Sequence, residues 1–327
     1  MLQVLEVTLP LFGLVFCGFF GQRMRLFPDG GVDALNRFVF YFALPAMLFR
    51  AIAFQPLSAY QQMPFFAAWA LSSMSCFALA YRFARAYLAK GPMAATVSAM
   101  NVTHPNVGYL GLPLALELGR EYVPLMVMAV MSDLFIVVVT SIVLLEIRAR
   151  KADAKILKEA RRLGVHPGGA PMHSITLTVL QGLAKSPLVI AAMFSLTFSV
   201  LALPIPPLLD HFSRLLGGAA APAALFAIGA SIGRSQLRLN RPSMTMIGWK
   251  LLIHPLIAAG IMAVMPGIDA QGMAIGIVAA SLPSASNTFI IGNRYGVHTG
   301  AVAQSIVAGS MIAVFSVSLA IAITGLR

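Results

Sequence analysis

The sequence predicts an all-α integral membrane protein with ten transmembrane helices, arranged as two inverted five-helix repeats. The first observation is composition: 59% of the 327 residues are hydrophobic and only 10% are charged, whereas a soluble domain carries about 25% charged residues. Mean hydropathy is +0.85. The net charge of +12 is spread between apolar stretches and not gathered on one soluble face, so it argues against nucleic-acid binding.

The second observation is the spacing of the apolar stretches, because crossing a bilayer as a helix takes about 20 such residues. Ten candidates are present, at 4–22, 34–54, 63–87, 93–117, 122–147, 186–206, 211–233, 243–265, 271–293 and 300–323. The start of the chain has no basic segment and contains Glu6, so we assign it to the first span and not to a cleaved signal peptide.

Lysine and arginine predict the orientation. Of these 23 residues, 19 fall in the loops that follow the odd-numbered spans or, as Lys250 does, close to one of them. The exceptions are Arg50, Arg120, Arg214 and Arg327. Because positive charge is retained on the cytoplasmic side, we expect the odd loops in the cytoplasm and both termini outside.

The third observation is internal similarity. Ala43–Ala53 matches Ala220–Ala230 at an offset of 177 with six of eleven identities, and Pro105 matches Pro283 at 178. Each half holds five spans, an odd number, so the halves are predicted to insert upside down relative to one another, as in many secondary transporters. The predicted division is a first repeat at 1–147, a cytoplasmic loop at 148–185 and a second repeat at 186–327. Within the loop, 150–163 fits either a basic helix on the inner leaflet or a solvated linker.

Two predicted spans are interrupted by polar residues and proline. The first interruption is Met100-Asn101-Val102-Thr103-His104-Pro105-Asn106-Val107-Gly108-Tyr109-Leu110-Gly111, and the second is Ala280-Ser281-Leu282-Pro283-Ser284-Ala285-Ser286-Asn287-Thr288. A broken helix is tolerated at membrane depth only where it is buried in protein or lines a cavity, and proline leaves carbonyls unpaired. Such a pair of interruptions in corresponding halves is a sequence indication of a transporter's substrate site.

If the two interrupted helices cross near Pro105 and Pro283, the N-terminal ends of their second halves converge and form an anion site from backbone N–H groups. Asn106 and Asn287 would add amide donors. Hydroxyl or imidazole groups would come from Thr103, His104, Ser284 and Ser286, and Gly108 would add flexibility at the crossing. The alternative is that these polar groups only satisfy the backbone that the prolines expose.

Titratable side chains within the predicted spans are candidates for coupling or substrate contact. His104 can change charge near neutral pH, so it is a candidate for proton coupling or a neutral hydrogen-bonding spacer. Asp133 is the one acid well inside a span, and an intramembrane carboxylate is a functional hypothesis by default. Lys250, one turn from His254, is expected to extend to the cytoplasmic surface.

Sequence patterns that resemble enzyme motifs give little support for a catalytic function. Gly229-Ala230-Ser231-Ile232-Gly233 fits the pattern G-x-S-x-G, but that motif requires a strand–turn–helix context, and here the glycines indicate helix packing. No H-E-x-x-H string and no Walker loop are present. Cys17 and Cys76 lie in apolar stretches without metal-ligand spacing. We therefore predict no catalytic residue, metal site or cofactor.

With these residues together, the chain resembles the auxin efflux carrier family, which includes plant auxin exporters and bacterial malonate- or malate-type permeases. The resemblance covers all ten spans. It rests on Asn36 with Ala43-Leu44-Pro45-Ala46, on His104 through Pro113, on Ala221 through Gly229, and on Pro283 with Asn287. Plant members carry an Asn-Pro-Asn type crossover, whereas this sequence has His104 in the first position.

The resemblance implies a fold related to bile-acid symporters and sodium–proton antiporters. Spans one, two, six and seven would form a scaffold with a homodimer interface through spans two and seven, and spans three to five and eight to ten would form an elevator-like transport domain. We expect a secondary transporter for a small mono- or dicarboxylate such as malonate, malate or an auxin-like acid, in a bacterial inner membrane. The alternatives are a sodium-coupled symporter of a larger acid, a membrane sensor, and an intramembrane enzyme using Ser231.

Overall fold

The computed structural model describes residues 2–28, 30–54, 62–88, 91–149, 186–234, 239–297 and 299–326. Across these ranges the chain is helical, and the only pairing of extended backbone is an isolated antiparallel bridge between Pro105 and Ser284. The segment 150–163, for which a basic helix or a solvated linker was predicted, lies outside the described residues.

At least one helix lies in each range for which a span was predicted. The all-helical prediction is confirmed for the described part of the chain. Their bounds are α1 Leu2–Arg23, α2 Gly31–Phe38, η1 Val39–Ala43, α3 Leu44–Ala53, α4 Met63–Phe83, η3 Ala84–Leu88, α5 Pro92–Thr103, η4 Val107–Gly111, α6 Leu112–Leu118, η5 Arg120–Tyr122, α7 Val123–Ser132, η6 Asp133–Val138, α10 Pro187–Val200, α11 Pro207–Gly218, α12 Ala220–Arg234, α13 Arg241–Gly248, η7 Trp249–Ile253, α14 His254–Val264, α15 Ala270–Ser281, α16 Asn287–Arg294 and α17 Gly300–Thr324.

Several of these elements run on into one another, and among the described residues six continuous helices are long and apolar enough to cross a membrane. They are Gly31–Ala53, Met63–Leu88, Arg120–Ala149, Pro207–Arg234, Arg241–Val264 and Gly300–Thr324. Shorter apolar helices occupy Val107–Leu118, Pro187–Val200 and Ala270–Ser281. The protein is therefore a multi-pass membrane protein.

The sixth and seventh predicted spans have different limits in the structure. The sixth was expected to run to 206, but α10 ends at Val200, and the next helix begins earlier than predicted, at Pro207. Three prolines in Pro204-Ile205-Pro206-Pro207 account for both differences. Proline disfavours helix in the residue before it, while it is well suited to the first position of a new helix.

Three π-helical stretches lie directly before prolines. Pro45, Pro113 and Pro255 follow η1, η4 and η7, each two residues after the stretch ends. A proline clashes with the carbonyl four residues earlier and cannot bond to it, and in each case that carbonyl lies within the π-helical stretch. The wider π turn thus lets the helix continue past the proline.

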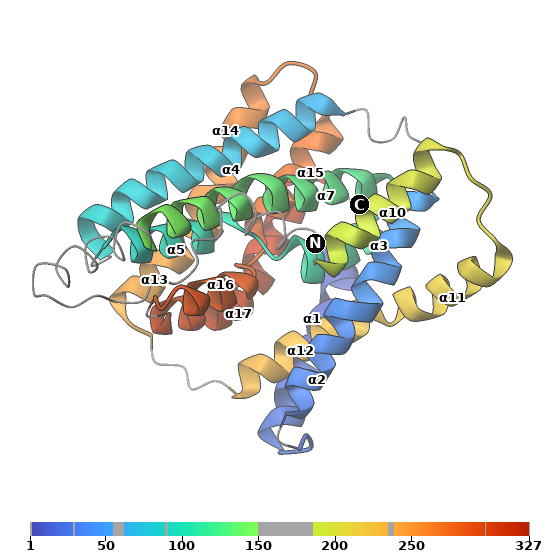
Figure 1. The fold of residues 1–327 in the computed structure, drawn as a ribbon, viewed down its shortest axis with the longest axis horizontal. Coiled ribbons are helices and arrows are strands. Elements are labelled where there is room, and N and C mark those ends of the chain that lie inside the picture. The colour runs from blue at the N-terminus through green and yellow to red at the C-terminus, as the bar shows by residue number, and fades with distance from the viewer. Residues whose placement is uncertain are drawn as a thin grey trace, which may run out of the picture.

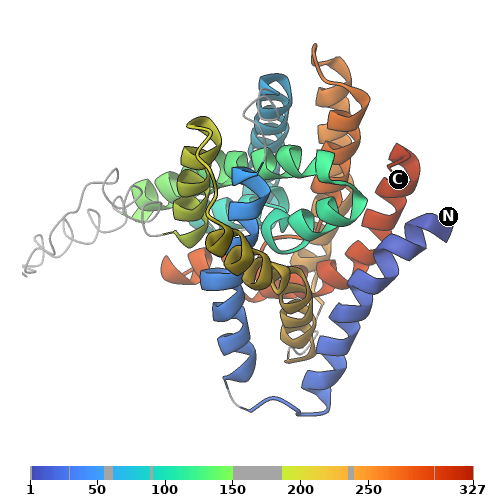
Figure 2. The same cartoon turned by 90° about the vertical axis from the view of Figure 1, so that its right-hand side faces the viewer.

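The helices pack as two groups, which Figures 1 and 2 show from two sides. In one group α1 packs along α12, and α3 packs against α10 and α11. In the other group α4 packs against α5, α7 and α14, while α17 packs against α13 and α15. Contacts between the groups are fewer and include α1 with α17, α12 with η4, and α3 with α7.

Glycines set the close approach of α1 to α12. A Cβ atom added at Gly229 would lie 1.8 Å from the carbonyl oxygen of Val15, and one added at Gly18 would lie 2.0 Å from that of Phe226. At Gly233 the corresponding distance is 2.7 Å, to the carbonyl oxygen of Phe19. Small residues let helix backbones approach closely in membranes, so the packing role predicted for Gly229 and Gly233 is confirmed.

Candidate functional site

The two interrupted helices meet at their prolines. The backbone N–H of Asn106 donates to the carbonyl oxygen of Pro283 at 2.8 Å, and the N–H of Ala285 donates to the carbonyl oxygen of His104 at 2.9 Å. This reciprocal pair is the antiparallel bridge between Pro105 and Ser284. It satisfies backbone groups that the two breaks would otherwise leave unpaired, which is the condition for an irregular backbone at membrane depth.

Both second halves begin directly after this crossing. Asn106 precedes η4, and its side-chain oxygen accepts a hydrogen bond from the N–H of Tyr109 at 3.4 Å. Because the amide oxygen acts as the helix cap, the amide nitrogen of Asn106 remains the part that can donate to a ligand. On the other side Asn287 is the first residue of α16. The crossing therefore brings two asparagines and two helix N-termini into one region.

Asn287 also contacts His104 across the crossing, with Nδ2 of Asn287 lying 3.1 Å from Nε2 of His104. An amide nitrogen only donates, so Nε2 accepts in this arrangement, and the proton of the neutral ring resides on Nδ1. Nδ1 faces Asp133, whose Oδ2 lies 3.7 Å away. One imidazole thus connects the asparagine of the second half with the buried acid of the first.

Asp133 is fully buried at the start of η6. Its Oδ1 accepts a hydrogen bond from Nε1 of Trp69 on α4 at 3.0 Å. A buried carboxylate needs such partners, because removing a charge from water is costly. Asp133, which the sequence singled out by its position alone, is therefore held between α4 and the crossing, within the same polar network as His104.

The prediction for Lys250 was wrong. Its side chain does not extend to the surface but is 1% exposed. Nζ donates to the carbonyl oxygen of Ala280 at 2.6 Å and lies 3.0 Å from Nδ1 of His254. Lys250 and His254 do lie one helical turn apart, as expected, but η7 packs against α15, so the side chain of Lys250 lies inside the protein.

The other predicted site residues differ in exposure. Thr103 and Ser284 are buried at the crossing, Ser286 is exposed, and Asn287 is partly exposed. Gly108 has an ordinary backbone conformation and open space where a Cβ would lie. The tightly enclosed glycine of this region is Gly111, where a Cβ would lie 2.8 Å from the sulfur of Met126.

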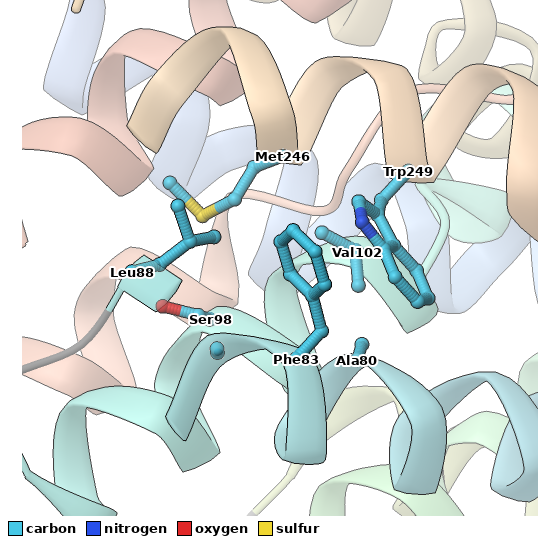
Figure 3. A pocket seen from close by; sticks show the side chains of 8 residues that line it. Ala80, Phe83, Leu88, Ser98, Val102, Met246 and Trp249 are labelled. Carbon is cyan, nitrogen blue, oxygen red and sulfur yellow. The ribbon is translucent and has the colours of Figure 1, made fainter. Parts of the chain in front are cut away.

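A small apolar pocket lies elsewhere, between the helix formed by α4 and η3, α5, and the helix formed by α13 and η7 (Figure 3). It is lined by Ala80, Phe83, Ala84, Leu88, Ser98, Val102, Met246 and Trp249. Ser98 supplies its one hydroxyl, and no cationic side chain is among these residues. The pocket is therefore lined almost entirely by apolar groups.

Sequence reasoning missed several residues that build this region. Trp69 had no motif to mark it, although it is one of only two tryptophans. Asn101 was counted as part of the interruption, but its Nδ2 donates to Oγ of Ser305 at 2.8 Å and so joins α5 to α17. The available signal was a buried amide on an otherwise apolar helix, which requires a partner.

Ser231 lies on α12 within the stretch that packs against α1, and its Oγ accepts a hydrogen bond from Nδ2 of Asn36 at 3.4 Å. The surrounding glycines face α1. A helix interior is not the strained turn that exposes a nucleophilic serine.

Comparison with known proteins identifies the family of this chain. A family model described as "Membrane transport protein" matches residues 3–321. The chain belongs to this family, the auxin efflux carrier family. Its members are transporters and not enzymes, so the alternative of an intramembrane enzyme using Ser231 is not retained.

Similar proteins span nearly the whole chain. A "Putative malonate transporter" of Rhizobium meliloti (strain 1021) is 28% identical over 324 residues, covering 97% of this chain and 95% of the relative. "Uncharacterized transporter YfdV" of Escherichia coli (strain K12) is 24% identical over 297 residues, covering 89% of this chain and 88% of the relative. "Probable auxin efflux carrier component 5a" of Oryza sativa subsp. japonica is 22% identical over 344 residues, covering 95% and 93%.

Proposed function

We propose that this member of the family is a secondary transporter for a small organic anion, a mono- or dicarboxylate of the size of malonate or malate. The observation that carries the proposal is the reciprocal backbone pairing of Asn106 with Pro283 and of Ala285 with His104. It supports a site in which two helix N-termini and two asparagine amides act on one carboxylate. Backbone N–H groups at a helix start favour an anion without needing a fixed cation.

Within this site Asn106 and Asn287 would orient the carboxylate. Nδ2 of Asn287 uses one hydrogen toward His104 and has a second to offer, since an amide nitrogen carries two donors. Thr103, Ser284 and Ser286 would contribute hydroxyl groups, of which Ser286 is the exposed one. Pro105 and Pro283 would maintain the break that keeps the backbone donors available.

The packing of the helices supports an elevator type of alternating access. The helices of spans one, two, six and seven form one packed group, and those of spans three to five and eight to ten form the other. Both interrupted helices belong to the second group. Sliding this group along the first would move an intact site across the membrane, and the two inverted repeats would provide its two end states.

The network next to the site would carry a coupling proton, with His104 and Asp133 as its members closest to the substrate. Histidine changes charge near neutral pH, so this pair could hold the proton or respond to the charge of the substrate. A sodium-coupled symporter of a larger acid is the alternative within transport, and a sensor that binds an anion without transporting it is the alternative from another class.

The proposed location is the inner membrane of a bacterium, with both termini outside and the loops after odd-numbered spans in the cytoplasm. The start of α1 and the end of α17 lie close to one another in both views, which agrees with termini on the same side (Figures 1 and 2). Association into a homodimer would use the surfaces of spans two and seven, and chemical cross-linking in native membranes would test it.

Counterflow in proteoliposomes tests the function. Vesicles loaded with unlabelled malonate would take up labelled malonate if the protein is a carrier, and malate, lactate and indole acetate would be compared in the same way. The double variant Asn106→Ala, Asn287→Ala should lose this uptake, because both amide donors are removed. Replacing sodium by potassium should leave uptake unchanged, whereas dependence on sodium would favour the sodium-coupled alternative.

A matched control is Asn293→Ala, since Asn293 lies on α16 after the crossing and its side chain bonds to Thr299. This variant should retain counterflow. Uptake that survives in the Asn106, Asn287 double variant would move the site elsewhere. Absence of uptake with all four acids, together with saturable binding of any of them, would favour the sensor.

A further inference from the structure

Lys250 is the one buried ammonium group among the described residues, and its contacts lie at the crossing. Its Nζ donates to the carbonyl oxygen of Ala280, in the last turn of α15, at 2.6 Å. It has a second contact with Nδ1 of His254 at 3.0 Å. A lysine is almost never fully buried unless its ammonium group is paired, because burial removes its hydration. An ionisable residue within a membrane is therefore a functional hypothesis by default.

The carbonyl that Lys250 binds is one of those released by the break in the ninth predicted span. Three nearby carbonyls have other donors: Ala279 has the N–H of Leu282, Ser281 has Oγ of Ser316, and Pro283 has the N–H of Asn106. Ala280 depends on Lys250. The ammonium group therefore takes part directly in holding one of the two interrupted helices in its broken form.

The charges around Lys250 are few. Against η7 pack α5, α13, α14, α15 and α17. The titratable group that these helices direct at it is His254 of α14. The ring of His254 packs against Trp69 of α4, with ring centroids 5.9 Å apart, and Nε1 of Trp69 donates to Asp133 of η6. Cys76 is a further buried titratable group, on α4. Asp133 leads on to His104 at 3.7 Å and from there to Asn287. One lysine and one aspartate are thus the opposite charges of a buried network that ends at the proposed anion site.

We propose that Lys250 carries the proton that is cotransported with the anion. In the loaded state Lys250 is an ammonium group that bonds to Ala280 and balances the added negative charge of the substrate. After the anion leaves on the side where the site is open, an N–H bond of the ammonium breaks, water accepts the proton, and the electron pair stays on Nζ. The empty site then returns with a neutral amine. Because the anion and the proton leave together, the net charge of the loaded site equals that of the empty site.

This inference rests on the proposed function, because it assigns the coupling group of the same site. Its physical basis is reciprocity: an anion bound at the crossing favours the protonated form of Lys250, and protonated Lys250 favours the anion by the same factor. Asp133 is the fixed counter-charge in this scheme, and His104 transmits the presence of substrate through Asn287. A proton gradient would then drive accumulation of the acid.

The decisive variant is Lys250→Arg, because a guanidinium group keeps the positive charge but does not release its proton in proteins. Wild type and variant would be compared in proteoliposomes in two assays. Counterflow of malonate at equal pH reports binding and movement of the loaded site, and accumulation of malonate under an inward proton gradient reports coupling. The ratio of accumulation to counterflow should fall in Lys250→Arg to that of an uncoupled carrier, whatever counterflow the variant retains, and a wild-type ratio would overturn the assignment. Asn293→Arg, on the surface-facing part of the same domain, should keep both.

A second measurement does not require transport. Purified protein in weakly buffered detergent solution is mixed with malonate, and a pH indicator follows proton uptake. Wild type should take up protons on binding, and Lys250→Arg and Lys250→Met should not. Proton uptake by Lys250→Arg equal to that of wild type overturns the assignment, as does loss of uptake in His104→Gln while Lys250→Arg behaves as wild type. Wild type without counterflow of malonate, malate, lactate or indole acetate would instead refute the proposed function itself.

Discussion

Asp33 and Asp210 lie 177 positions apart (from 33 to 210), at the offset that aligns Ala43–Ala53 with Ala220–Ala230, and each forms an ion pair with an arginine of the other half. Asp33 accepts two bonds from Arg234, at 3.0 and 3.2 Å, and Asp210 binds Arg50. The pairs join opposite ends of Gly31–Ala53 and Pro207–Arg234, so these two helices run antiparallel. Antiparallel corresponding helices are what repeats of opposite orientation require.

We expect the ion pair of Arg50 with Asp210 to contribute more to stability than that of Asp33 with Arg234. The side chains of the former are 31% and 36% exposed, and those of the latter 52% and 55%. Exposed pairs contribute about 0.2–1 kcal/mol. Double-mutant cycles with Arg50→Gln and Asp210→Asn, and with Arg234→Gln and Asp33→Asn, would measure both by thermal unfolding in detergent. A larger coupling energy for Asp33 with Arg234 would contradict the expectation.

The glycine contacts between α1 and α12 predict a selective effect of alanine. Gly229→Ala would place a Cβ against the carbonyl oxygen of Val15, so α1 and α12 must separate and the protein should lose stability. Gly260→Ala on α14 is the matched control, since a Cβ there meets open space. Alanine exceeds glycine in helix propensity by about 1 kcal/mol, so Gly260→Ala should unfold at the same or a higher temperature. Equal unfolding temperatures of the two variants would show that the close approach is not needed.

The bond between Asn101 and Ser305 is expected to fix α5 against α17. Both side chains are buried, and Nδ2 of Asn101 donates to Oγ of Ser305 at 2.8 Å. Removing one partner leaves a buried polar group unsatisfied at a cost of about 1–3 kcal/mol. Ser305→Ala and Asn101→Ala should therefore each lower the unfolding temperature, and the double variant should lose less than their sum. Additive losses would mean that the two side chains do not interact.

Trp69 is predicted to matter through its Nε1–H group, which donates to Asp133. Trp69→Phe keeps the aromatic packing but leaves one oxygen of a buried carboxylate without its donor, so counterflow of malonate should fall. Trp249→Phe is the matched control, because Trp249 lines the apolar pocket and packs on Phe83. If both variants transport as wild type does, Asp133 does not require this support.

The predicted orientation is testable with single cysteines in a variant lacking Cys17 and Cys76, the two that the chain contains. Arg25→Cys, in the loop after α1, is expected to be cytoplasmic, and Gly267→Cys, in the loop between α14 and α15, is expected outside. A membrane-impermeant maleimide applied to intact spheroplasts should label only the cysteine at 267. Labelling of the cysteine at 25 alone would show that the topology is the reverse of the predicted one.

Several features followed from residue patterns because they depend on local chemistry. Composition predicted a multi-pass helical membrane protein, since every backbone group must be satisfied within the bilayer. The two proline interruptions were located to within a few residues because proline breaks helical bonding wherever it occurs. By contrast, the limits of the sixth span depended on how three nearby prolines were shared between two helices.

The sequence by itself determined that the chain is a membrane transporter of this family with two polar interruptions, because hydropathy, prolines and glycines act over a few residues. Only the tertiary structure decided which of the polar groups meet. His104 joins Asn287 to Asp133, and Lys250 turns inward to Ala280, through contacts between residues 29 to 183 positions apart. Such contacts depend on the rotation of each helix about its axis, which the packing of all neighbouring helices sets together.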